Sequence, residues 1–110
     1  MRRALFAAVL AVLAATGCAT SSAYRAGEQA ERRQDYDKAV LEYSRALQLH
    51  PDDLNARGAL QRARLRASAE HLKAGRRLSG RGLEKEALDE LRLALDLNPT
   101  SSPRRSRASI

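Results

Sequence analysis

The chain of 110 residues has no tryptophan, one phenylalanine, two histidines and one cysteine, and these shortages limit its chemistry. Cys18 has no second cysteine with which to form a disulfide inside the chain. His71 lies in a predicted helix beside Glu70, and adjacent helical positions do not face each other. No nucleophile, base and orienting group stand at a recognisable spacing, and no metal-binding or phosphate-binding motif occurs. We therefore expect no enzyme activity, no cofactor, no metal and no small-molecule substrate.

Long apolar runs are also missing. The longest, from Ala4 to Ala15, is too short to span a bilayer, which needs about 20 residues. It follows Arg2 and Arg3 and precedes small residues, an order that is typical of a secretory signal. We predict that residues 1–17 are such a signal.

An internal repeat is the main feature that the sequence does have. Residues at one constant separation match, as Gly27 matches Gly75 and Pro51 matches Pro99. The two copies end in LQLHP and LDLNP. Self-similarity at a fixed period is typical of repeat proteins, in which each helical unit buries its apolar face against a neighbour. The sequence thus predicts an all-α domain over residues 23–99.

The spacing within each copy identifies a family that the chain resembles. Gly27, Ala39, Tyr43, Ala46 and Pro51 follow one another at intervals of twelve, four, three and five residues, and the second copy repeats these intervals with Leu91 in place of the aromatic. This order resembles the tetratricopeptide (TPR) repeat. The resemblance implies two antiparallel helical hairpins, with packing positions at Gly27, Tyr36, Ala39, Tyr43, Ala46, Pro51, Gly75, Ala87, Leu91, Ala94 and Pro99.

Physical arguments support these positions. Gly27 and Gly75 are expected to let two helix backbones approach closely, because they carry no side chain. Pro51 and Pro99 should each end a helix. Asp52 and Asp53 offer an N-cap oxygen to the helix that follows.

The repeat is longer than a TPR unit, because the step from Gly27 to Gly75 exceeds the TPR period by two heptads. Alanines and leucines recur mostly at steps of three and four residues across this insertion. We predict one elongated middle helix from Leu54 to about Leu78. The alternative is two helices broken near Gly58.

The segment Ala15-Thr16-Gly17-Cys18 resembles a bacterial lipobox, although Ala15 stands where a branched aliphatic is usual. The resemblance implies that Cys18 is lipidated, that residues 18–22 form a polar tether, and that Ala19 directs the protein to the outer membrane, facing the periplasm. The alternative is ordinary signal cleavage after Ala19 or Ala23, which would give a secreted or periplasmic soluble protein.

Charge gives a weaker indication. The formal net charge of +7 includes Arg104, Arg105 and Arg107 in the Ser/Arg/Pro segment at 100–110, which we expect to be disordered. Nucleic-acid binding would call for exposed stacking aromatics or a known motif beside the cations, and neither is present. No helix with a polar outer face follows the second copy, so we hypothesise that the chain is the N-terminal piece of a larger protein.

The expected function is a membrane-anchored scaffold for protein–protein interaction, whose partner is a protein or peptide of the cell envelope. TPR grooves are generally lined by the first helix of each pair. Carried over by position, the resemblance gives a candidate groove of Tyr24, Glu28, Glu31, Leu72, Arg76 and Ser79. The order of signal, tether and TPR pair also resembles the N-terminal region of lipoprotein secretins of type II secretion or type IV pilus machinery. The alternative is thus a truncated secretin.

Overall fold

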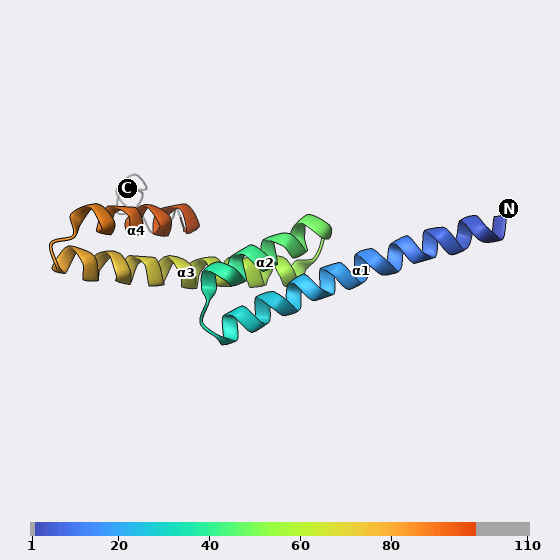
Figure 1. Cartoon of the computed structure of the whole chain (residues 1–110), viewed down its shortest axis with the longest axis horizontal. Helices are drawn as coiled ribbons and strands as arrows, with labels where there is room; N and C mark the ends of the chain where they lie inside the picture. Colours follow the sequence, from blue (N-terminus) through green and yellow to red (C-terminus); the bar gives the residue numbers. More distant parts are fainter. Residues whose placement is uncertain (1, 99–110) are drawn as a thin grey trace, which may run out of the picture. The chain divides into compact units, whose positions relative to one another are not determined.

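The computed structural model describes residues 2–98, which form four α-helices (Figure 1). These are α1 (Arg2–Arg32), α2 (Tyr36–Leu49), α3 (Leu54–Gly80) and α4 (Glu84–Leu97). No strand occurs within residues 2–98, which confirms the all-α prediction for this range. Pro99 and the segment at 100–110 lie outside the described residues, as do the side chains of residues 7–21, Cys18 included.

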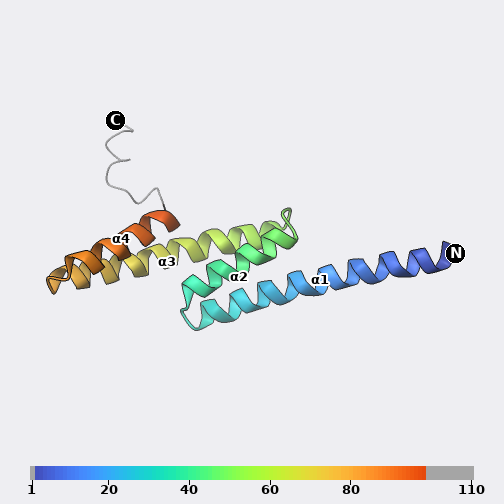
Figure 2. The same cartoon turned by 45° about the horizontal axis from the view of Figure 1, so that its top comes forward.

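The chain divides into two units, Met1–Leu60 and Gln61–Ile110, and each contains one helix pair. In the first unit α2 runs back along α1, and in the second α4 runs back along α3 (Figures 1 and 2). None of the helices in the described part of the chain combines the length and apolar character that crossing a bilayer requires.

Hydrogen bonds fix the turn between α1 and α2. Asp35 N donates to Ala30 O at 2.9 Å and Gln34 N donates to Glu31 O at 2.9 Å, the pattern of a Schellman motif. Gln34 adopts the left-handed conformation that this motif requires, with φ of 61°. The side chain of Asp35 then accepts from Lys38 N at 3.2 Å and caps α2. One residue, Asp35, therefore closes α1 and opens α2.

The turn between α3 and α4 repeats this backbone pattern at the matching place in the second copy, with different side chains. Leu83 N donates to Leu78 O at 2.9 Å and Gly82 N to Ser79 O at 3.0 Å. Glycine here supplies the left-handed residue, with φ of 80°. Leu83 is the N-cap of α4 and makes no side-chain cap hydrogen bond.

The connection between α2 and α3 confirms three predictions. Helix α2 ends at Leu49, just before Pro51, and His50 N donates to Ala46 O at 2.9 Å. Asp53 Oδ1 accepts from Asn55 N at 3.0 Å and from Ala56 N at 3.1 Å, which caps α3. Helix α3 then continues through Gly58 to Gly80, so the predicted long helix is confirmed and the break near Gly58 is wrong.

Helix α1 includes residues 18–22, for which the sequence predicts a polar tether. That prediction concerns the chain after removal of residues 1–17, which this structure retains.

The buried apolar residues of the described chain are alanines apart from Tyr43, which is fully buried. Such small residues let helices pack at the low end of the usual spacing of about 8–10 Å. Most predicted packing positions are buried, namely Gly27, Ala39, Tyr43, Ala46, Gly75, Ala87 and Ala94. Tyr36 and Leu91 are half-buried. Pro51 is exposed, so its role as a packing residue is wrong, because its ring lies in the connection beyond the end of α2.

Candidate functional site

Tyr43 is the centre of the first helix pair, and Gly27 makes room for it. A Cβ atom added at Gly27 would lie 2.5 Å from Tyr43 Cε1 and 2.9 Å from Tyr43 Cζ, closer than real atoms pack. The sequence predicted that this glycine lets two backbones meet. The structure corrects that reason, because the aromatic ring of α2 fills the space above Gly27.

Two predicted groove residues of α1 also contact Tyr43. The Tyr43 hydroxyl donates a hydrogen bond of 2.6 Å to Glu31 Oε1. The ring of Tyr24 lies 5.4 Å from that of Tyr43 between centroids, tilted by 53°. Tyr24 and Glu31 therefore help to join α1 to α2, a role that the sequence analysis did not assign to them.

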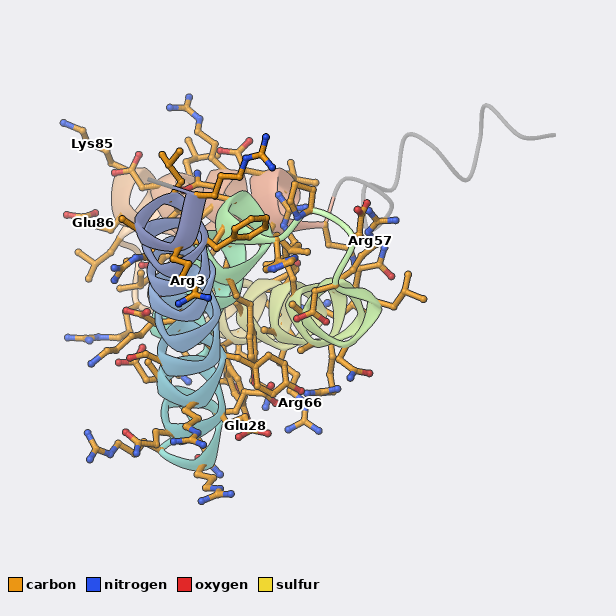
Figure 3. The ribbon with its side chains drawn as sticks, turned by 90° about the vertical axis from the view of Figure 1, so that its right-hand side faces the viewer. Arg3, Glu28, Arg57, Arg66, Lys85 and Glu86 are labelled. Atoms are coloured by element: carbon orange, nitrogen blue, oxygen red, sulfur yellow. The ribbon has the colours of Figure 1, made fainter. Side chains whose placement is uncertain are left out.

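Tyr24 has a further contact, with the small apolar core of the first unit. Ala23, Ala46 and Ala56, from three different helices, form this core, and the half-buried side chains of Tyr24 and Leu47 pack against it. Glu28, the third groove candidate on α1, is half-buried, and its side chain projects from the helix in Figure 3. Of the α1 candidates, Glu28 is the one for which these contacts assign no role in the helix pair.

The candidates in the second unit lie on α3. Leu72 is half-buried, and Arg76 and Ser79 are exposed. The Ser79 hydroxyl donates to both carboxylate oxygens of Glu84, at 3.2 and 3.4 Å, and so links the end of α3 to the start of α4. Leu72 and Arg76 lie one helical turn apart on the same side of α3, as a binding surface on this helix would need.

Two polar contacts between α3 and α4 were missed by the sequence analysis. His71 Nδ1 lies 2.5 Å from Glu90 Oε2, and the side chains are 17% and 29% exposed. The buried hydroxyl of Ser68 donates to Ala94 O at 2.8 Å. The turn at Gly82 was the signal that could have found them, because an antiparallel pair folded there brings residues 71 and 90 opposite each other.

The second pair is closed by Gly75, as the first is by Gly27, but less tightly. A Cβ atom at Gly75 would lie 3.1 Å from Leu91 Cδ2 and 3.3 Å from Ala87 O. The neighbouring leucine is flexible, whereas the ring of Tyr43 is held by Glu31 and Tyr24. Both helix pairs have a glycine at this position, and they differ in how tightly the side chain of the facing helix packs over it.

These contacts join the helices within each pair to each other. Among the described side chains, those of residues 2–6 and 22–98, no group of three or more His, Cys, Asp and Glu could hold a metal ion. The predicted site residues fall on two separately described units, with Tyr24, Glu28 and Glu31 in one and Leu72, Arg76 and Ser79 in the other.

Comparison with known protein families, curated proteins and solved structures gives no match to this chain.

Proposed function

We propose that this protein is a membrane-anchored scaffold of the TPR type that binds a protein or peptide partner in a bacterial cell envelope. The observation that carries the proposal is the repetition of a helix pair, with the same turn hydrogen bonds and the same seat of small residues in both copies. In the TPR family, which the sequence resembles, the first helix of each pair generally lines the binding surface, and α1 and α3 are the first helices of the two pairs.

Binding would involve the side chains that the helix pairs do not use internally. Tyr24 and Glu31 contact Tyr43, and Ser79 contacts Glu84. The remaining groove candidates are half-buried Glu28 on α1 and, on α3, half-buried Leu72 and exposed Arg76. A carboxylate and a guanidinium on the two first helices suit a partner that carries charges of both signs.

The proposed anchor is a lipid on Cys18, with residues 1–17 removed. Two or more acyl chains would hold the protein stably at a membrane, because each buried methylene contributes about 0.8 kcal/mol. The positive start at Arg2 and Arg3, the apolar run from Ala4 to Ala15 and the cysteine that follows support this proposal.

Mass spectrometry of the protein isolated from bacterial membranes would test the anchor. We expect a chain that begins at Cys18 and carries the added mass of acyl groups, and we expect Cys18→Ala to leave the membrane fraction. An unmodified Cys18 in the membrane-derived protein would contradict lipidation.

Crosslinking and capture from intact envelopes would test the scaffold. Glu28→Lys and Arg76→Glu are expected to lose a partner that the wild-type chain captures. Lys85→Glu is the matched control, because Lys85 is an exposed cation on α4 and projects from that helix in Figure 3. Equal capture by all variants would overturn the assignment of α1 and α3 as the binding helices.

A further inference from the structure

Helix α4 carries large apolar side chains that are exposed. Leu88 is 53% exposed and Leu95 is 40% exposed. They are seven residues apart and lie with half-buried Leu91 on one side of α4, because residues at i, i+3 and i+7 share a helix face. We call Leu88, Leu91 and Leu95 the leucine stripe.

The corresponding positions of α2 are less exposed than Leu88 and Leu95. In the first copy of the repeat, Val40 and Leu47 stand in the places of Leu88 and Leu95, and both are half-buried. In the first unit Leu47 packs against a small core to which α3 contributes one alanine, Ala56.

The first half of α3, which contributes Ala56 to this core, has a distinctive pattern of residues. Ala56, Ala59 and Ala63 recur at i, i+3 and i+7 and are all buried. Residues 54–67 also carry four arginines and no carboxylate, the arginines being Arg57, Arg62, Arg64 and Arg66. A helix of this kind has alanines along one face and arginines at many of its other positions.

Helix α4 is more acidic than α2, which suits a basic helix. Its carboxylates outnumber its cations by five to two, Glu84, Glu86, Asp89, Glu90 and Asp96 against Lys85 and Arg92. In α2 the numbers of carboxylates and cations are equal, with Asp37 and Glu42 against Lys38 and Arg45. Opposite net charge favours encounter and selects among partners.

We propose that the leucine stripe docks a basic α-helix of a partner protein, which presents alanine-sized residues at i, i+3 and i+7. The contact would resemble the one in the first unit, where Ala56 of α3 shares a core with Ala46 of α2. The proposal goes beyond the anchor and the groove on α1 and α3, and needs neither.

A peptide with the sequence of residues 54–67 has the required chemistry and serves as the probe. Added in labelled form to the purified full-length chain, it is expected to bind saturably in fluorescence anisotropy. A control peptide carries Gln in place of Ala56, Ala59 and Ala63 and keeps the same charge. We expect it to bind about tenfold more weakly, because its larger polar side chains do not fit against the leucines.

Variants of α4 locate the binding site. The double variant Leu88→Gln/Leu95→Gln is expected to weaken binding of the wild-type peptide by about tenfold. Leu93→Gln is the matched control, because Leu93 is 46% exposed on the opposite side of α4 and its replacement should leave the affinity unchanged. Circular dichroism checks that each variant keeps its helices.

Three results would overturn the proposal: no saturable binding up to about 1 mM peptide, equal binding of both peptides, or an equal loss with Leu93→Gln. The two peptides are compared on the unaltered protein, so the test stands even where a variant fails to fold. A negative result here would leave two other tests unchanged: the mass of the mature N-terminus, and the loss of partner capture expected for Arg76→Glu. Failure of the α4 docking proposal can therefore be told apart from failure of the scaffold proposal.

Discussion

The two helix pairs share one backbone design and solve its local problems with different side chains. In the first turn Asp35 provides an N-cap, but Gln34 is held in the left-handed region. In the second turn Gly82 adopts that region without a steric cost, but Leu83 provides no side-chain cap. Each pair therefore has the favourable residue where the other lacks it.

The interiors differ as well. Tyr43 fills the first pair, bonded to Glu31 and packed on Tyr24, whereas half-buried Leu91 occupies the matching place in the second. The second pair adds the buried hydroxyl of Ser68 and the contact between His71 and Glu90. The comparison shows that the two copies share the turn geometry and the buried glycine and alanine positions, whereas the larger side chains around them differ.

Removing the aromatic should have the largest effect. Tyr43→Ala is expected to lower the free energy of unfolding by about 3–5 kcal/mol, as for other large buried aromatic side chains. Leu91→Ala should cost less, because Leu91 is only half-buried. Urea unfolding followed by circular dichroism would measure both. Equal losses would show that the two interiors contribute alike.

Replacing Gly27 and Gly75 by alanine should change the free energy of unfolding by different amounts in the two helix pairs. Gly27→Ala is expected to cost about 1–3 kcal/mol through overpacking against the ring of Tyr43. Gly75→Ala should cost less than Gly27→Ala, because Leu91 can shift and alanine favours a helix by about 1 kcal/mol, although the backbone oxygen of Ala87 lies 3.3 Å from the added Cβ.

Gly58→Ala is the control for these two variants, since nothing lies within 4 Å of its added Cβ. It should stabilise the chain by about 1 kcal/mol. A stabilising Gly27→Ala would contradict the close seating of Tyr43.

Exchanging the left-handed residues tests the turns. Gly82→Ala should destabilise the second pair by about 1–2 kcal/mol, the cost of this conformation for a residue with a side chain. Gln34→Gly should stabilise the first pair by relieving the same strain. Hydrogen exchange of the amides of α2 and α4 would report each pair separately. We expect Gly82→Ala to lower and Gln34→Gly to raise the free energy of unfolding of its helix pair. A change in the same direction for both variants would contradict the difference between the two turns.

Exchanging the caps should have the smallest effect. Asp35→Ala is expected to cost about 1 kcal/mol through loss of the bond to Lys38 N. Leu83→Asp should stabilise α4 by a similar amount, because Leu83 has backbone angles close to those of Asp35. Thermal unfolding of the two single variants would measure these changes. A destabilised Leu83→Asp would show that the leucine contributes more by its contacts than a cap can replace.

The sequence predicted the features that depend on local chemistry. The C-terminal end of α2, the cap at Asp53, the length of α3 and the small buried residues follow from proline, aspartate, glycine and the alanine spacing. These residue types restrict the backbone directly, wherever the rest of the chain lies.

Features that depend on the register between helices were not predicted. The partner of His71 is Glu90, nineteen residues away, and that of Tyr43 is Glu31, twelve away. Such pairs form only once two helices are aligned, and a shift of one residue would bring other side chains together. The placement of Tyr24 and Glu31 within the first pair could not be read from their spacing for the same reason.

The alanine interior has a thermodynamic consequence. Alanine methyl groups bury little nonpolar surface. The increase in heat capacity on unfolding grows with the nonpolar surface that becomes hydrated. The increment should therefore fall below the roughly 12–15 cal/mol/K per residue of ordinary globular domains. A molecule held together in this way would change its stability only gently between cold and warm surroundings.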